Sequence, residues 1–215
     1  MTAVVDVPLL ELSALTWETH GTRRGLSPDP LTIPPGQAAV VVAAGSAEAD
    51  AFADLLLGLE MPVGGRIRIL DEEVTMRLPA DRAIGLVPAG AGLLPHRTVE
   101  QNLALAVRDN ELVHGTVAYM ARRMKIQGFL RSRPHELAHD EQLYVALARA
   151  LCRHTPPKLM VVEDRTGYGP CHAAVSAALR TDPGLAVLVV TDDRTRVASL
   201  ASPSRVWEVA DVAEP

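Results

Sequence analysis

The chain has 215 residues and a hydrophobic content of 48%, which suits one α/β domain with a sizeable core. Its formal net charge of −5, without an evident basic stripe, argues against nucleic acid as a partner. Its two cysteines, Cys152 and Cys171, lack metal-ligand spacing, and no apolar stretch approaches the length of a membrane span. We therefore expect a soluble, cytoplasmic protein without a metal site.

The first quarter of the chain predicts two short strands and then a strand, a loop and a helix. Leu9–Thr16 loosely alternates apolar and polar residues, Gly21–Pro30 is rich in turn residues, and Leu31–Ile33 is a short strand. Ala38–Ala44 is continuously apolar, as in a strand buried on both faces of a parallel sheet. A Gly/Ser/Ala loop follows, and Asp50–Leu59 is predicted to be a helix with one apolar face. This layout is typical of a phosphate-binding loop.

The middle of the chain predicts helices. Thr98 and Gln101 have the spacing of a capping box that opens a helix. Ala104–Arg133 is predicted to be mostly helical. Six of its residues are expected to be internal: Tyr119, Met120, Met124, Ile126, Phe129 and Leu130.

A helix followed by a strand that ends in two acids is the most informative part of the second half. Apolar residues recur at helical spacing within Pro134–Leu151, and Leu159–Val162 is a short β-prone run. Glu163 and Asp164 follow directly. Because ligands collect at the carboxyl ends of parallel strands, such acids are where α/β nucleotide enzymes hold Mg²⁺ and a water.

The remaining elements complete an α/β pattern. Cys171–Leu179 is predicted to be a short helix, Leu185–Thr191 a buried strand and Arg205–Val209 a last strand.

Several of these passages resemble the ATP-binding cassette (ABC) ATPase family, the nucleotide-binding subunits of ABC transporters. The resemblance rests on P-H-E-L at Pro134–Leu137, V-A-L-A-R-A-L at Val145–Leu151, the strand ending in two acids, and L-L-L-G-L-E-M-P-V-G-G-R-I-R-I-L. It covers roughly Leu9 to Val209. It implies a P-loop NTPase-like α/β core with a parallel-rich sheet and flanking helices. Residues 1–215 would form one domain, with a short helical subdomain inserted at approximately 99–150.

The phosphate-binding loop of that family is degenerate in this chain. The motif G-x-x-x-x-G-K-[ST] uses glycines so that backbone N–H groups cradle phosphates, a Lys that reaches them and a hydroxyl that ligates Mg²⁺. By resemblance, the Lys position is Ala49, the hydroxyl position is Asp50 and the preceding Gly position is Glu48. Acids stabilise a helix N-terminus but repel the phosphate that would bind there. The degenerate loop comprises Gly45, Ser46, Glu48, Ala49 and Asp50.

The other nucleotide contacts that the resemblance implies are also missing. The position of the glutamine that contacts metal and attacking water is Ala89, and the switch-histidine position is Asp192. The signature L-S-G-G-Q reads Leu137, Ala138, His139, Asp140 and Glu141. Only the strand-end acids persist. In the family they read Asp-Glu, and here they occur in the reverse order, as Glu163 and Asp164. We therefore expect no catalytic residue and no cofactor, with ATP and Mg²⁺ bound only if residual affinity survives.

Three hypotheses follow. The first is a pseudo-ATPase, a structural or regulatory subunit that docks on a membrane permease or a homologous ATPase subunit, as a homo- or heterodimer, through Leu103–Arg133 and Pro88–Arg97. A permease could then hold it at the inner face of the membrane. The second is a divergent α/β enzyme or ligand-binding domain in which Glu163, Asp164, and also Asp192 and Asp50, bind a cation or a small cationic ligand. The third is an ordinary transporter ATPase with unorthodox nucleotide contacts.

Overall fold

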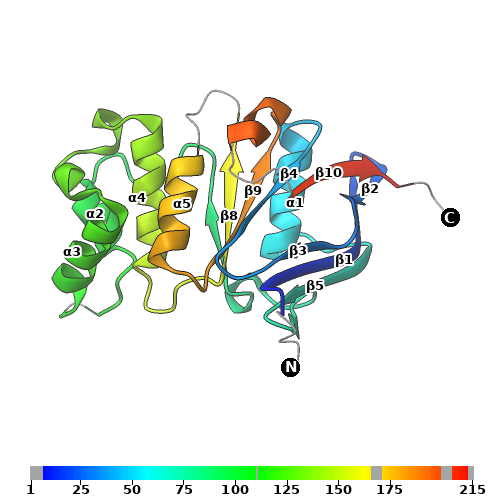
Figure 1. The fold of residues 1–215 in the computed structure, drawn as a ribbon, viewed down its shortest axis with the longest axis horizontal. Coiled ribbons are helices and arrows are strands. Elements are labelled where there is room, and N and C mark those ends of the chain that lie inside the picture. Colours follow the sequence, from blue (N-terminus) through cyan, green and yellow to red (C-terminus); the bar gives the residue numbers. More distant parts are fainter. Residues whose placement is uncertain (1–6, 110, 166–170, 200–204, 213–215) are drawn as a thin grey trace, which may run out of the picture.

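A mixed β-sheet runs through the molecule, with helices packed on both of its faces (Figure 1). The computed structural model describes residues 7–109, 111–165, 171–199 and 205–212. The strand order is β6-β5-β1-β2-β10-β4-β9-β8-β7, and β3 pairs with β1. The strands are β1 (Leu10–Thr19), β2 (Thr22–Ser27), β3 (Leu31–Ile33), β4 (Ala38–Val42), β5 (Gly64–Ile69), β6 (Glu72–Glu73), β7 (Ile84–Val87), β8 (Leu159–Asp164), β9 (Ala186–Thr191) and β10 (Val206–Asp211).

The sheet has a parallel half and an antiparallel half. Strands β10, β4, β9, β8 and β7 run parallel to one another. Strands β6, β5, β1 and β2 are antiparallel, and β2 joins the two halves by pairing with β10. The predicted α/β class, with its buried parallel strands, is therefore confirmed.

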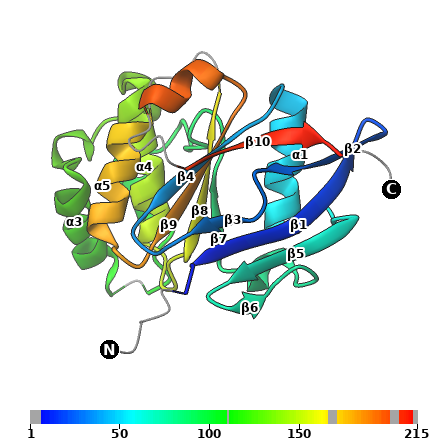
Figure 2. The ribbon, with the colours of Figure 1, turned by 45° about the vertical axis from the view of Figure 1, so that its right-hand side comes forward.

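Two hydrophobic cores lie on opposite faces of the parallel strands, because alternate side chains of a strand point to opposite faces. Val40 and Val42 of β4 face α4 and α5, whereas Val41 faces α1. Figures 1 and 2 show α1 on one side of these strands and α3, α4 and α5 on the other. The helices are α1 (Ser46–Leu57), α2 (Val99–Ala104), α3 (Val113–Met124), α4 (His139–Leu151) and α5 (His172–Thr181); the 3₁₀ turns are η1 (Pro79–Asp81), η2 (Gln127–Phe129), η3 (Pro134–Glu136) and η4 (Arg194–Ser199).

Helix α1 differs from its predicted bounds at both ends. It begins at Ser46, not Asp50, because Ala47 and Ala49 are good helix formers and nothing in Ser46–Asp50 breaks the helix. It ends at Leu57, since Gly58 adopts a left-handed conformation (φ 79°) and a Cβ there would collide with the Arg82 side chain. Leu59 is therefore outside the helix and 65% exposed, so its placement on the apolar face was wrong.

The segment Gly21–Pro30, interpreted from its composition as turns, contains strand β2. Thr22–Ser27 pairs with β1 on one side and β10 on the other. This pairing outweighs the low β-propensity of its arginines and glycine. The difference has a functional consequence, because β2 supplies Arg24.

The helical segment between β7 and β8 is less continuous than predicted. The capping box at Thr98 and Gln101 is confirmed at the start of α2. Met120, Met124 and Ile126 are buried, but Tyr119 is 52% exposed because it lies on the solvent face of α3. In the described ranges, no helix is both long enough and apolar enough to cross a membrane.

Candidate functional site

The carboxyl ends of β4, β9 and β8 meet at one edge of the sheet, next to the N-terminus of α1. The parallel registers align Val42 and Asp164 with Thr191. The Ala43 amide donates to the Thr191 carbonyl at 2.9 Å, which fixes the start of the loop after β4. The degenerate loop and the strand-end acids therefore lie at the same sheet edge, as predicted for parallel strands.

Most of the predicted phosphate-binding loop is helical. Only Ala43–Gly45 connects β4 to α1, and Gly45 is the residue that precedes the helix, in an extended conformation (φ −172°). Ser46 is the first residue of α1, and Ala49 is fully buried in the core beneath it. The glycine, lysine and hydroxyl positions therefore lie in the first turns of α1, where the N–H groups of a helix N-terminus can bind a phosphate unless another group occupies them.

Glu48 lies where an anion would interact with this loop. Its Oε2 accepts a hydrogen bond from the Ala44 N–H at 2.5 Å, and its Oε1 is 2.9 Å from Nε of Arg24. The Glu48 side chain is only 7% exposed. An N–H of the loop and a guanidinium are the groups that recognise phosphate oxygens. The carboxylate of the chain itself occupies both.

Arg165 lies between two of the acids singled out in the sequence, Asp50 and Glu163. Its Nη2 pairs with Oδ1 of Asp50 and is 3.8 Å from Oε1 of Glu163. The other oxygen of Glu163, Oε2, accepts the Ala89 N–H at 3.0 Å. Asp50 and Glu163 correspond to the two positions that hold Mg²⁺ in the resembling family, and here a guanidinium lies between them. Ala89, at the glutamine position, contacts Glu163 only through its backbone N–H.

Asp164 is buried and paired with Arg196. The Arg196 Nη1 lies 2.6 Å from Oδ1 of Asp164, whose side chain is 3% exposed. Burial raises the pKa of Asp164, and the attraction of Arg196 only partly opposes that rise. Burial, reinforced by the Asp164 charge, also raises the pKa of the neighbouring Cys171 thiol to about 12. Asp192, at the switch-histidine position, follows β9 and has interactions of its own.

Helix α4 begins at the positions that the resemblance assigns to the signature. The Ala138 amide donates to Oε2 of Glu141 at 2.8 Å, so the carboxylate closes the helix N-terminus. Asp140 is exposed. His139 lines a cavity of about 30 Å³ together with Gln142, Glu163, Asp164 and Cys171. That volume is about the share of one water molecule in the liquid.

Three arginines, Arg24, Arg165 and Arg196, are the residues that sequence reasoning missed. Arg24 lay in a segment interpreted as turns, and Arg196 follows a strand without any motif. Arg165 offered a signal, because it directly follows the two acids, where the resembling family has proline. Within the described residues, no group of three or more His, Cys, Asp or Glu side chains is placed to hold a metal ion.

Comparison with known proteins identifies the fold and the family. The structure superposes on the ADP conformation of an ATP-binding cassette of an ABC transporter with a TM-score of 0.73, at 16% identity, covering 90% of this chain and 85% of that one. A nucleotide-free ATP-binding cassette gives a TM-score of 0.70 at the same identity and coverage. The architecture is therefore that of an ATP-binding cassette.

Residues 31–164 match the family described as ABC transporter, and the chain belongs to that family. It is 34% identical over 169 residues to the thiamine import ATP-binding protein ThiQ of Brucella suis, covering 75% of this chain and 70% of ThiQ. It is 29% identical over 164 residues to the putrescine transport ATP-binding protein PotG of Escherichia coli, covering 74% of this chain and 43% of PotG. The curated relatives are thus ATP-binding subunits of ABC transporters.

Proposed function

We propose that this chain is a pseudo-ATPase, an ABC-type subunit that has lost ordinary ATP binding and hydrolysis and serves a structural or regulatory role in a transporter-like complex. The observation that carries the proposal is the N-terminus of α1. There the Glu48 carboxylate takes both the Ala44 N–H and the Arg24 guanidinium. An arriving polyphosphate would meet a buried negative charge in place of free donors.

The signature half of the site supports the same proposal. In the family, each ATP lies between the phosphate loop of one subunit and the signature of the other. Here the Glu141 carboxylate accepts the Ala138 N–H at the signature positions, and Glu48 occupies the N–H and the guanidinium next to α1. A dimer of this chain with itself or with an intact homologue would therefore complete neither composite site in the usual way.

The surface proposed for docking on a permease or an ATPase subunit contains an amphipathic groove. A cavity of about 470 Å³ is lined by apolar residues of β7, of the loop after it, of the segment that follows α2 and of α4, and by three arginines. The residues that matter are Leu86, Leu94, Leu105, Arg108, Arg149 and Arg153. Leu105 is 52% exposed, and Arg108 and Arg153 are exposed as well. An amphipathic segment with acidic residues on its polar side fits this combination.

This groove lies between the α/β core and the helices at approximately 99–150, which we propose to be an inserted helical subdomain of a single domain over residues 1–215. A permease bound there would hold the protein at the cytoplasmic face of a membrane. The names of the relatives refer to thiamine import and to putrescine transport, which suggests transport as the process and selects no substrate for this chain.

The alternative of a metal-dependent or cation-binding enzyme has less support. Asp50, Glu163 and Asp164 each face an arginine of the chain, so the charges that a cation would need are already neutralised. Among the described residues at the carboxyl ends of β4, β8 and β9, no contact favours a cation-binding enzyme over a pseudo-ATPase.

Hydrolysis and docking can be tested together. Purified protein, alone and with the subunits that co-purify from membranes, should show no ATPase activity attributable to this chain. An activity that Asp164→Ala abolishes and Asp71→Ala preserves would refute the proposal, because Asp71 is an exposed acid that follows β5 in the antiparallel half of the sheet.

For docking, we expect the tagged chain to recover a permease or an ATPase subunit. Arg108→Glu combined with Arg153→Glu should lose that partner, since both side chains line the groove. The matched pair Arg66→Glu and Arg77→Glu, on the antiparallel side of the molecule, should retain it. Recovery of neither kind of subunit by the unaltered chain would contradict the docking role.

A further inference from the structure

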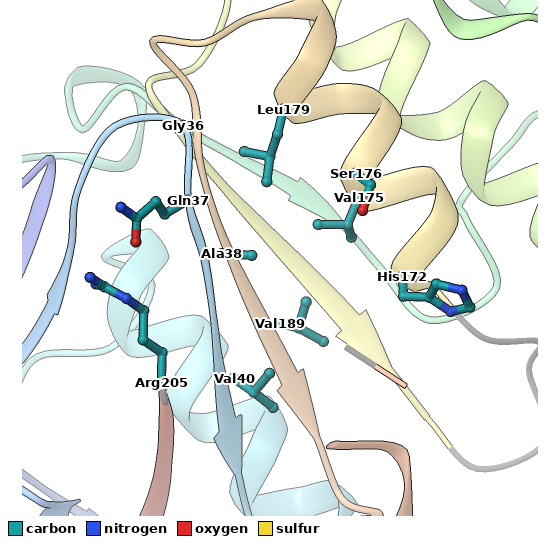
Figure 3. Close-up of a pocket in the computed structure, with 10 residues that line it drawn as sticks. All are labelled: Gly36, Gln37, Ala38, Val40, His172, Val175, Ser176, Leu179, Val189 and Arg205. Carbon is teal, nitrogen blue, oxygen red and sulfur yellow. The ribbon is translucent and has the colours of Figure 1, made fainter. Parts of the chain in front are cut away.

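Helix α5 has two flanks, and each of them lines a different cavity. Val175 and Leu179 face β4 and β9 on one flank (Figure 3). Ala177 and Arg180 share the other flank, since residues three apart lie on the same side of a helix, and this flank meets α3 and α4. The cavity between these three helices has a volume of about 300 Å³. That size is at the lower end of the range for small-molecule pockets.

The floor of the cavity between α3, α4 and α5 is apolar and buried. Met124 ends α3, Ile126 follows it, and Ala177 lies opposite on α5; all three are buried. The Thr181 hydroxyl is 3.4 Å from Sδ of Met124, so the last turn of α3 packs directly against the last turn of α5. An apolar group that covers this floor is removed from water, which favours its binding.

Two aromatic rings complete the apolar part of the lining. Phe129 of η2 and Tyr144 of α4 are partly buried and pack against the hydrophobic core on this face of the sheet. The whole chain has only two phenylalanines, three tyrosines and two tryptophans, so two aromatic residues at one cavity are a local concentration. Because aromatic rings attract one another in stacked and edge-to-face arrangements, this lining favours a planar ring as the ligand.

Three exposed cations line the same cavity: Arg123, Lys125 and Arg180. Nη2 of Arg123 donates to the carbonyls of Arg180 and Thr181, at 2.9 and 3.1 Å. This guanidinium is therefore held at the turn of α5 that contacts Met124, on the same side as the apolar floor. The described residues provide no carboxylate partner for any of the three cations.

Glu141 of α4 is the one acidic residue that lines the cavity in the described part of the chain. Its Oε2 accepts the Ala138 N–H at 2.8 Å, so the N-terminus of α4 stabilises its negative charge. The lining thus sets three positive charges against one negative charge that is already bound, in a chain whose net charge is −5. This excess of positive charge favours an anion as the ligand.

We propose that this cavity binds a small anion with a planar apolar ring and two negative charges, such as an aryl phosphate. The ring lies on the buried floor and contacts Phe129 and Tyr144. The phosphate meets Arg123, Lys125 and Arg180, because cations without carboxylate partners recognise phosphate oxygens by charge-assisted hydrogen bonds. Such a ligand would bridge the last turns of α3 and α5, and so would hold the helical segment between β7 and β8 against the α/β core.

Calorimetric titration of the full chain with phenyl phosphate, phenol and inorganic phosphate tests this assignment. We expect saturable binding of phenyl phosphate. Phenol, which lacks the charge, and inorganic phosphate, which lacks the ring, should each bind more weakly by about tenfold or more. No binding of phenyl phosphate, or equal affinity for phenyl phosphate and either fragment, would overturn the proposal.

Two pairs of substitutions locate the binding. Lys125→Gln combined with Arg180→Gln should weaken phenyl phosphate binding by about tenfold or more, because two exposed cations of the lining are lost. The matched pair Arg122→Gln and Arg131→Gln removes two exposed cations outside the lining and should behave like the unaltered chain. Unchanged affinity in the first pair, or an equal loss in both pairs, would contradict the site. Since no probe is a nucleotide and no substitution lies at the carboxyl ends of β4, β8 and β9, the result is independent of whether the chain is a pseudo-ATPase.

Discussion

The two ends of helix α1 are both stabilised by charged side chains, but in opposite ways. At the C-terminal end, Arg82 is fully buried and donates to four backbone carbonyls, those of Leu55, Leu56, Thr75 and Arg77. At the N-terminal end, Glu48 and Asp50 supply negative charge and are paired with Arg24 and Arg165. Arg82 contacts only backbone carbonyls, whereas Glu48 and Asp50 pair with side chains and Glu48 also accepts the Ala44 N–H.

This difference between the two ends of α1 indicates which end corresponds to the phosphate site of a nucleotide-binding relative. A helix carries partial positive charge at its N-terminus and partial negative charge at its C-terminus. Arg82 satisfies the C-terminal carbonyls, a framework role that does not involve a ligand. Glu48 satisfies the N-terminal end from within the chain, at the place where phosphate would bind in a nucleotide-binding relative. Both ends are therefore complete without ATP.

Breaking the C-terminal end should have the largest effect. Arg82→Met fills a similar space but leaves four buried carbonyls without a donor, so we expect a loss of about 3 kcal/mol or more in the free energy of unfolding. Burial already lowers the pKa of the Arg82 guanidinium, as expected for a cation held by carbonyls alone. Urea denaturation measures the loss. Arg66→Met, an exposed control, should change stability by well under 1 kcal/mol; a similar loss in both variants would contradict the buried role of Arg82.

Breaking the N-terminal end should cost less, because Arg24 is partly solvated. We expect Glu48→Gln to destabilise the chain by about 1–3 kcal/mol. In a double-mutant cycle with Arg24→Gln, the combined loss should be smaller than the sum of the single losses. The exposed pair Arg77 and Glu72 is the control, with an expected coupling of about 0.5 kcal/mol or less. Simple additivity for Glu48 and Arg24 would show that they do not interact.

Asp164, at the end of β8, should make the free energy of unfolding depend on pH. Burial raises the pKa of Asp164, so its folded form holds a proton where the unfolded chain has lost it. The stabilisation is therefore present below the ordinary carboxyl pKa and is lost as pH rises through the raised folded pKa. As the pH falls through the raised pKa of Asp164 towards the ordinary carboxyl pKa, the unaltered chain should therefore gain stability relative to Asp164→Asn.

Asp193 provides a matched comparison of opposite sign. Hydrogen bonds from Thr195 lower the pKa of Asp193, so its contribution is present above the ordinary carboxyl pKa and is lost as pH falls. The difference between the unaltered chain and Asp193→Asn should therefore shrink on acidification. Parallel pH trends for Asp164→Asn and Asp193→Asn would contradict the assignment of a buried, proton-retaining Asp164.

The smallest expected signal comes from the two thiols. Burial raises the pKa of both Cys152 and Cys171 to about 12. At pH 8, about one thiol in ten thousand would then be ionised, so neither should react with a disulfide reagent in the folded chain. Both should react in urea. Rapid labelling of Cys171 without denaturant would show that the strand-end region opens far more readily than its burial indicates.

The sequence predicted the elements that depend on local pattern. The apolar strands β4, β8 and β9 and the α2 capping box were recognisable because their signals lie within a few residues of one another. The start of α1 was missed by four residues, because resemblance suggested a loop where the alanines favour helix.

The charge pairs at the site could not be predicted, because their partners are distant in sequence. Arg24 meets Glu48 only because β2 pairs between β1 and β10, and Arg165 lies 115 residues from Asp50. By resemblance, the sequence predicted that the usual phosphate-binding residues are missing. Only the packed structure shows what has replaced them.

Equilibrium binding of MgATP is the measurement that tests the central claim most directly. It should be made on the unaltered chain and on a variant carrying Ser46→Gly, Glu48→Gly and Asp50→Ser, which keeps the buried Ala49. We predict no saturable binding by the unaltered chain and measurable binding by the variant, since the internal carboxylates are gone and a phosphate ligand can reach the loop. Tight MgATP binding by the unaltered chain that is lost in Asp164→Ala would contradict the account and restore the strand-end acids as a metal–nucleotide site.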